Sequence, residues 1–373
     1  MNRQRGYILF MTFSMLALCT ALVSVFMVKG ITHKKFATVL LDQDQINQLA
    51  LSTPALAQSF LGFSATEMKE VKDAQKKSAE QKTDESQSGD EAEGFSKLIL
   101  KKVLPVVNKT QKFNLKEVEK DFSVVVNLTF FCESGKININ GLYDLVNKKF
   151  YDEGVPEKDQ KVFATWLFGK IAAITEKPSL LQPFVEHVKQ RKVPFNDVTE
   201  LLAIKEFATC FSQAVFYEPE QQNTTSDKKT RKLFLTDIFT VASENDTIQP
   251  WLLSPSVCAL LDIAQKGGKQ GESEKKEEIK VDLSFFKQQA DWQKDWDTGL
   301  KSLYDISYDK IPEPVRFMLS KQFSAKVFST LITVAREIAD SENNIEARIF
   351  AILKERRLQD DSIMYDVIRI YQV

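Results

Sequence analysis

The chain has 373 residues, 43% of them hydrophobic and 27 of them Phe, which is enough material for two or three domains with their own cores. Its 50 Lys and Arg residues balance 51 Asp and Glu residues to a net charge of -1, so there is no overall positive field to attract nucleic acid. With only two His residues in the sequence, a Ser-His-Asp or Cys-His catalytic arrangement has little to draw on.

An apolar run of 22 residues without a charge extends from Tyr7 to Val28. At about 1.5 Å per residue, a helix of this length reaches about 33 Å, enough to cross a bilayer core of about 30 Å. The run is longer than the central region of a secretory signal, and it ends in Val28-Lys29 without the small residues of a cleavage site. We therefore predict a transmembrane helix over residues 7–30 that stays on the mature protein.

A short basic leader, residues 1–6, abuts this run and resembles the leader of type IV pilin-like proteins. In those proteins a membrane peptidase cuts after the glycine, on the cytoplasmic side. The resemblance implies a processing site at Arg5, Gly6 and Tyr7, with the bond after Gly6 as the one cut. Basic residues flank both ends of the run, so charge alone does not orient it. Leader processing implies a cytoplasmic N-terminus, and a plain membrane anchor is the alternative.

Residues 31–66 continue with apolar side chains at helical spacing, and we predict a periplasmic helix there. Pro54 is expected to break or kink this helix, or to restart a second one from a cap at Ser52-Thr53. Residues 67–94 consist of Lys, Glu, Gln, Ser and Asp with almost no large apolar residue, which predicts a disordered charged linker.

The segment 95–134 is predicted to hold a short helix that ends at Pro105 and a strand, rich in β-branched and aromatic residues, at 122–132. Gly135 marks a turn after this strand. An Ile-Asn-Ile-Asn segment follows the turn, and we expect a helix to begin at Leu142.

Residues 135–232 are predicted to form an inserted helical domain that ends in a polar loop at 221–232. Asp197 and Glu200 have the spacing of a capping box, in which each side chain bonds to the backbone at the start of a helix. His187 has no Cys or His nearby in the sequence and is interpreted as structural. The expected helix boundaries are Pro156, Gly169, Pro178, Pro183, Pro194 and Pro219.

A second helical part is predicted over residues 233–322. It opens with a strand candidate at 234–242, and a helix follows that begins at Pro255. A second charged insert occupies residues 265–280. The next helix is expected to carry Trp292, Trp296, Leu300 and Leu303.

The C-terminal segment 323–373 reads as strands. Residues 327–338, 345–353 and 364–373 carry apolar runs or alternation, with an Asn-Asn turn at 343–344. Three antiparallel strands that close one sheet are the economical interpretation. The predicted fold class is therefore α+β.

No catalytic constellation is indicated, because the sequence lacks the glycine-rich phosphate loops, the nucleophile elbow and the zinc motif H-E-x-x-H. Cys132, Cys210 and Cys258 are spaced too widely for a zinc site, and three separate thiols are favoured while pairing of two stays open. Acidic pairs such as Asp360-Asp361 are typical of solvated loop charge. Calcium needs only oxygen ligands and remains possible, but without a specific loop pattern no metal and no cofactor is predicted.

Four features, in this order, resemble the K-type minor pseudopilin of the type II (general) secretion pathway. They are the leader with its apolar run, a helical region inserted after a first strand, the segment Glu133-Ser-Gly-Lys-Ile-Asn-Ile-Asn-Gly-Leu that opens it, and the C-terminal strands. Within the insertion, the stretch from Pro194 to Ile204 looks like the family's helix-hairpin element, and Ile248-Gln-Pro-Trp opens the second part. The resemblance implies a pilin-like N-terminal membrane helix, an antiparallel sheet and a large inserted all-α region of two sterile-alpha-motif-like parts. The Leu-Leu after Trp251 departs from the family's usual pattern, and the 67–94 insert is atypical.

Met11 stands at the fifth position after the expected cut, where most pilin-like subunits carry Glu. A carboxylate within a membrane helix is costly unless it is paired. In the family it is thought to pair with the N-terminal amine of a neighbouring subunit. A subunit at the filament tip has no neighbour above it, so the resemblance implies that Met11 marks the tip position.

The implied function is therefore not enzymatic. The resemblance implies a minor pseudopilin that caps the tip of the secretion pseudopilus, held in the bacterial inner membrane by one span with its body in the periplasm. The implied partners are the I- and J-type minor pseudopilins, the prepilin peptidase and the inner-membrane secretion platform, and no nucleic acid. A minor pilin of a related type IV pilus or DNA-uptake filament, and a single-pass envelope scaffold protein, are the alternatives.

Overall fold

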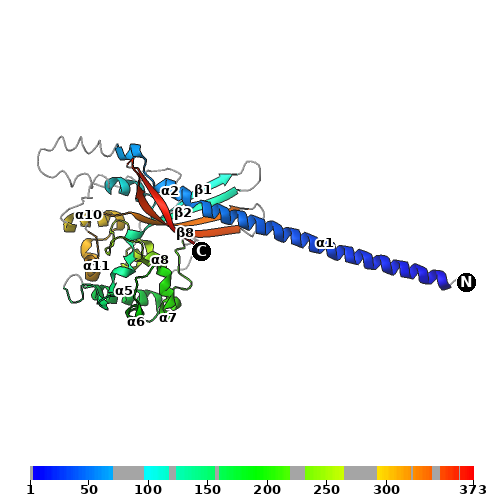
Figure 1. The fold of residues 1–373 in the computed structure, drawn as a ribbon, viewed down its shortest axis with the longest axis horizontal. Coiled ribbons are helices and arrows are strands. Elements are labelled where there is room, and N and C mark those ends of the chain that lie inside the picture. Colours follow the sequence, from blue (N-terminus) through cyan, green and yellow to red (C-terminus); the bar gives the residue numbers. More distant parts are fainter. Residues whose placement is uncertain are drawn as a thin grey trace.

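A long helix projects from a body made of one sheet and a group of short helices (Figure 1). The structure is a computed structural model, and it describes residues 3–69, 96–116, 123–155, 159–218, 232–263, 292–320, 322–337, 345–360 and 362–373.

The sheet has five strands, and every neighbouring pair is antiparallel. Its order is β1-β2-β7-β8-β9, so the first two strands join the last three across the long segment that separates them in sequence. This confirms the predicted antiparallel sheet and the α+β class, and β1 is a strand that the sequence did not suggest. The bounds are Thr110–Lys116 for β1, Ser123–Cys132 for β2, Val327–Glu337 for β7, Ile345–Arg357 for β8 and Ile363–Gln372 for β9.

Both faces of the sheet are covered over its centre, because alternate residues of a strand point to opposite faces. Val126, Leu128 and Phe130 of β2 belong to the main core, whereas Phe131 belongs to a smaller cluster with Phe350 of β8. The central strands β2, β7 and β8 are therefore buried on two sides, which explains their high content of large apolar residues.

Two N-terminal helices cover the first face. Helix α1, Arg3–Ser52, contacts β7 and β8 only near its C-terminal end, where Ile46 and Ala50 are buried. There Asp42 forms an ion pair of 2.5 Å with Arg336 of β7. Helix α2, Pro54–Leu61, contacts β9. The predicted break at Pro54 is confirmed, and α2 begins there with Thr53 as its N-cap residue. The Thr53 side chain does not bond to the helix N-terminus, because its hydroxyl donates to the carbonyl of Leu49.

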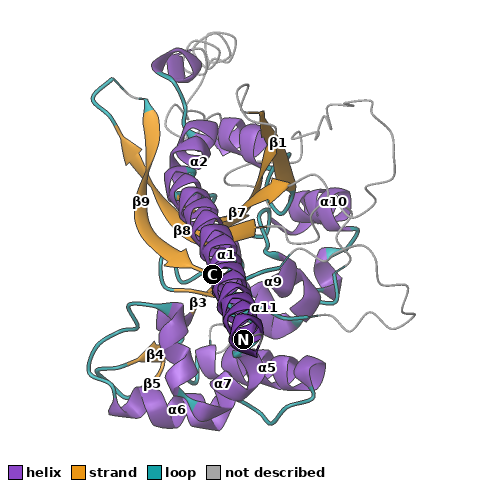
Figure 2. Ribbon diagram, turned by 90° about the vertical axis from the view of Figure 1, so that its right-hand side faces the viewer, coloured by secondary structure: helices purple, strands orange, loops and turns teal. Residues whose placement is uncertain are grey.

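The segment between β2 and β7 is termed here the helical region. When the molecule is viewed along α1, its helices α5, α6 and α7 lie below the sheet and α10 lies beside it (Figure 2). Its core is aromatic, and Phe163, Phe168, Phe184, Phe207 and Phe239 are fully buried. Its longer helices are α5 Gln160–Thr175, α6 Leu181–Gln190, α7 Lys205–Phe211, α9 Pro255–Leu260 and α10 Trp292–Tyr304, with short helices α8 Leu235–Ile238 and α11 Glu313–Arg316. Short 3₁₀ helices are η1 Glu133–Gly135, η2 Ile139–Gly141, η3 Val198–Ala203 and η4 Tyr308–Lys310.

The expectation of an all-α insertion is wrong, because four short strands lie within the helical region. Strand β3, Ile137–Asn138, pairs in parallel with β6, Phe239–Thr240, and β4, Tyr143–Asp144, pairs with β5, Lys149–Phe150. The parallel pair brings together segments about a hundred residues apart, a pairing that local sequence patterns do not reveal.

Two predicted elements have the wrong type. The helix expected from Leu142 is instead the β4–β5 hairpin, because Asp144 accepts hydrogen bonds from the backbone N–H groups of Val146 and Asn147 and so closes a tight turn. The strand expected at 234–242 is wrong over its first half, where α8 forms, and only Phe239 and Thr240 are in a strand. A short apolar run buried on all sides fits either element, and packing decides between them.

Two expected helix boundaries are also wrong. Gly169 lies inside α5, where a Cβ would meet no atom within 4 Å, and Pro183 lies in the first turn of α6. The first turn tolerates proline because its N–H groups have no helical partner. In contrast, the capping box of Asp197 and Glu200 is confirmed, as are the Pro255 start of α9 and the helix α10.

Several predictions fall where the structure gives no description. These are most of the charged linker at 67–94, all of the charged insert at 265–280, the loop at 221–231 and the turn at 343–344.

Candidate functional site

The predicted processing site lies in the first turns of α1. Arg5, Gly6, Tyr7 and Met11 are all within the helix, whose backbone is continuous on both sides of Gly6. Their side chains fall outside the described set, so their roles remain predictions of the sequence.

The free part of α1 exposes a long series of large apolar side chains. Ten of them between residues 13 and 41 are 53% to 71% exposed. Removal of such side chains from water is worth about 1.5–3 kcal/mol each, so this surface favours a lipid environment or contact with other helices. The ten exposed apolar side chains are those of Phe13, Met15, Leu16, Phe26, Met27, Val28, Ile31, Phe36, Leu40 and Leu41.

Among the described residues, no helix has both the length and the hydropathy of a membrane span.

A buried ion pair lies where β2 passes into the helical region. Lys136 and Glu133 are 1% and 3% exposed, and Lys136 Nζ donates to Glu133 Oε1. Ser329 Oγ of β7 donates to the same carboxylate oxygen at 2.5 Å, and Thr240 Oγ1 of β6 donates to Oε2, also at 2.5 Å. These partners satisfy the carboxylate, as a buried charge requires.

Asp237 of α8 adds a second buried carboxyl group to this site. Its Oδ2 accepts from the backbone N–H of Ser256 at 2.6 Å, whereas its Oδ1 has no hydrogen-bond partner. Burial raises the pKa of Asp237, and the positive charge of Lys136 only partly opposes that effect. Glu133, Lys136, Asp237, Thr240 and Ser329 are termed the buried ionic cluster.

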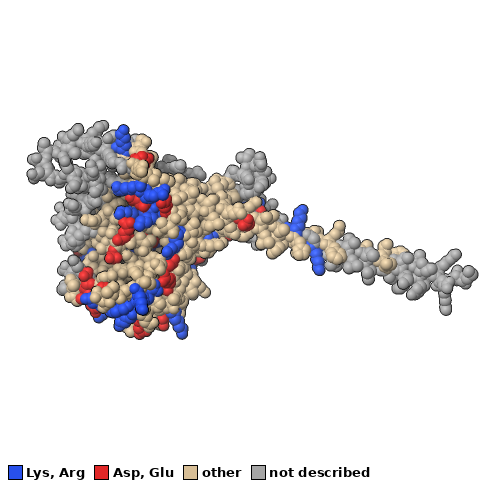
Figure 3. Space-filling view, viewed as in Figure 1, with Lys and Arg blue, Asp and Glu red and all other residues tan. Residues whose placement is uncertain are grey.

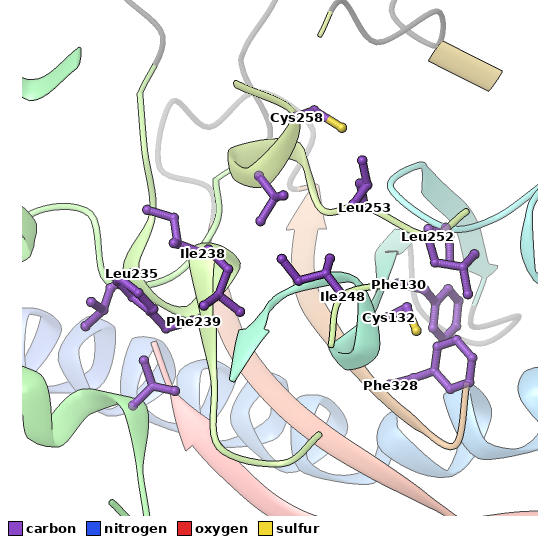
Figure 4. Packing of buried hydrophobic residues seen from close by; sticks show 14 of the residues in the cluster. Phe130, Cys132, Leu235, Ile238, Phe239, Ile248, Leu252, Leu253, Cys258 and Phe328 are labelled. Atoms are coloured by element: carbon purple, nitrogen blue, oxygen red, sulfur yellow. The ribbon is translucent and has the colours of Figure 1, made fainter. Parts of the chain in front are cut away.

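The cluster joins the helical region to the sheet, since its members come from η1, α8, β6 and β7. The backbone adds to this joint, because Gln249 N–H donates to the Ser134 carbonyl at 2.7 Å. At Gly135 the contact is so close that a Cβ atom would lie 1.7 Å from the Leu252 carbonyl oxygen, so only glycine fits. Figure 4 shows the surrounding apolar core, in which Phe130 and Phe328 of the sheet pack in the same cluster as Leu252.

A second joint connects the capping box of η3 to the end of β9. Asp197 Oδ2 accepts from Arg369 Nη1 at 2.8 Å and from the Tyr371 hydroxyl, while its Oδ1 accepts from the Thr199 N–H. Burial would raise the pKa of Asp197, but the hydrogen bonds from Tyr371 and Thr199 and the charge of Arg369 outweigh it, so the pKa lies below its usual value. The helical region is thus tied to two strands of the sheet.

Neither joint has the features of an active site. The buried ionic cluster is closed to solvent, and the charged groups of Glu133 and Lys136 are directed at each other. Cys132, Cys210 and Cys258 are reduced thiols, and burial raises the pKa of Cys132 to about 12, which makes it unreactive. His187 stacks on Phe195 at 6.1 Å between ring centroids, in agreement with a structural role. Within the described ranges, no three His, Cys, Asp or Glu side chains are grouped to hold a metal ion.

Sequence reasoning did not identify the buried ionic cluster, although a signal was present. Glu133 and Lys136 flank Ser-Gly directly after an apolar strand, so two charges enter the core at a tight turn. A scan against models of known protein families and a search of the curated proteins both find no match for this chain.

Proposed function

We propose that this chain is a K-type minor pseudopilin that caps the tip of the type II secretion pseudopilus and takes part in protein export across the cell envelope. The observation that carries the proposal is α1, a single helix of 50 residues that begins within the basic leader and bears a long series of apolar side chains that stay exposed among the described residues. Such a helix suits lipid before assembly and neighbouring helices after it.

The attachment of the helical region supports a capping role. A cap must stay in place when a further subunit would otherwise stack on it, and a region held by a loose linker would swing aside. Here the buried ionic cluster and the joint at Asp197 fix the helical region to β7 and β9. The region therefore has the rigidity that an obstruction needs.

The proposed life of the protein follows from its N-terminal segment. The prepilin peptidase would cut after Gly6, and the chain would stay in the inner membrane with its body in the periplasm. It would then join the I- and J-type minor pseudopilins above the secretion platform. Met11, with no carboxylate to pair, would suit the subunit that has no neighbour above.

The test is the mass and N-terminal sequence of the mature chain, produced with and without the prepilin peptidase. We expect a start at Tyr7 only when the peptidase is present. Gly6→Val should block this processing, whereas Gly30→Ala, at the other end of the apolar run, should be processed as the wild type is. An intact Met1 in the presence of the peptidase, or a start near residue 30, would refute the proposal.

A further inference from the structure

A group of basic residues surrounds two exposed valines at the outer end of the helical region. Val146 is 88% exposed in the β4–β5 turn, and Val193 is 59% exposed in the loop after α6. The two segments touch, because Lys148 Nζ donates to the Arg191 carbonyl at 2.6 Å. Exposed lysines complete the surface, which is termed the basic tip and consists of Val146, Lys148, Lys149, Lys189, Lys192 and Val193.

The acidic groups near the basic tip already have partners within the chain. Asp144 accepts from the backbone of its own turn, Glu200 pairs with Arg191 at 2.7 Å, and Glu186 accepts from Gln182 at 2.8 Å. Lys149 lies opposite Asp144 in the β4–β5 pair, and its charge adds to the backbone hydrogen bonds that lower the pKa of that carboxyl group, whereas the Lys148 ammonium group donates to a backbone carbonyl. Figure 3 shows Lys and Arg side chains along the lower edge of the body, with a few acidic ones among them.

The loop that contains Val193 is held in place by several side-chain interactions. The Arg191 side chain donates to the carbonyls of Val193 and Pro194 and lies over the Phe195 ring, 4.1 Å from its centroid. Asn140 then holds the Phe195 backbone from both sides, since its Oδ1 accepts the N–H and its Nδ2 donates to the carbonyl. A surface held in this way loses little conformational entropy on binding.

We propose that the basic tip is a docking surface for an acidic, extended segment of another protein, with carboxylates on the lysines and an apolar side chain between the two valines. An apolar centre with a charged rim is the ordinary composition of a protein-binding surface. Charge complementarity selects the acidic partner and raises its association rate.

A lipid surface fits the basic tip less well, and this step alone rests on the membrane anchor proposed above. With the apolar run in the bilayer, residues 29–41 of α1 hold the body about 20 Å from the membrane, at about 1.5 Å per residue. The helices α5 to α7 lie at the end of the molecule away from the start of α1 (Figure 1). Attraction to anionic headgroups decays within about 8–10 Å at ordinary salt, so the basic tip is out of range.

The test uses the full chain in a nonionic detergent and a fluorescent peptide of alternating Glu and Leu, about 12 residues long so that it spans the surface when extended. We expect saturable binding that weakens with added salt. Lys148→Glu/Lys192→Glu and, separately, Val146→Ser/Val193→Ser should each weaken it about tenfold. The control Lys177→Glu/Lys310→Glu, with the same charge change at two exposed lysines outside the basic tip, should bind as the wild type does.

Three outcomes would overturn the proposal: no binding of the peptide, equal binding by all variants, or equal binding of a peptide of alternating Lys and Leu. A fourth outcome would overturn the proposal and indicate another ligand. In it, the chain does not bind the acidic peptide, but its basic tip binds vesicles that contain about one-third phosphatidylglycerol, or binds a thymidine oligonucleotide. All substituted residues are exposed, and thermal unfolding monitored by circular dichroism would verify that each variant folds. Failure here leaves the processing experiment intact, so the two proposals are separable.

Discussion

The buried ion pair gives the sharpest quantitative prediction. Lys136→Met would leave the Glu133 carboxylate buried with two hydroxyl partners and no positive charge, close to a second buried carboxyl group at Asp237. Removal of one member of a buried pair costs about 3–5 kcal/mol, because the remaining charge keeps its desolvation penalty. At about 2–4 °C per kcal/mol for a body of this size, the melting temperature should fall by about 6–20 °C.

The assay is thermal unfolding of the full chain in nonionic detergent, followed by circular dichroism. The double variant Glu133→Gln/Lys136→Met removes both charges and should recover a large part of the loss. Lys161→Met breaks the exposed pair with Glu153 and should leave the melting temperature nearly unchanged, as exposed pairs contribute little. If Lys136→Met has the melting temperature of the wild type, or if the double variant is no more stable than the single one, the buried ion pair does not stabilise the fold in the way described.

Three further predictions concern the same two joints. Gly135→Ala should destabilise the chain by about 1–3 kcal/mol or more, because the new Cβ meets the Leu252 carbonyl. Gly169→Ala, in open space within a helix, should stabilise the chain by about 0.5–1 kcal/mol. Urea unfolding measures both changes in the free energy of unfolding. Burial raises the pKa of Asp237, so the contribution of this carboxyl group to stability is full below its unfolded pKa of about 3.9 and is lost as pH rises through its folded pKa. Asp237→Asn should therefore raise the melting temperature at pH ~8 and not at pH ~4. The same change in melting temperature at both pH values would contradict this. The pKa of Asp197 is lowered, so its bonds to Arg369 and Tyr371 add stability above pH ~4, and this stability is lost as pH falls through the folded pKa. The difference in melting temperature between pH ~6 and pH ~3 should therefore be smaller for Asp197→Asn than for the wild type. An equal difference in both proteins would refute this.

Elements with strong local signals were predictable from the sequence. The strand β2, the C-terminal strands and the break at Pro54 follow from β-propensity, alternation and the missing proline N–H. The capping box at Asp197 follows from spacing alone, yet its bonds to Arg369 and Tyr371 do not, because they join residues more than 170 positions apart. Position in three dimensions gave that side chain its second role.

The misjudged elements share a physical cause. The run 234–242 is apolar on every side, so its period could not separate a helix from a strand. The turn at Asp144 was not predicted, because the residues around it have helical spacing. The Asp144 side chain accepts hydrogen bonds from two backbone N–H groups, and these bonds favour the turn over the helix. Glu133 and Lys136 have further partners only because three segments distant in sequence, at 133–136, 237–240 and β7, meet in the fold.

The way α1 enters the body has a mechanical consequence. The helix is gripped only at its C-terminal end, by Asp42 on Arg336 and by the buried Ile46 and Ala50, and β7 and β8 run roughly along its axis (Figure 1). A push or pull on α1 is thus passed lengthwise into β7, which has ten paired residues with β2 and ten with β8. Hydrogen bonds between antiparallel strands stand perpendicular to the strands, so such a load shears all of them together and cannot unzip them one by one. A load along α1 would therefore be resisted by all the hydrogen bonds of β7 at once.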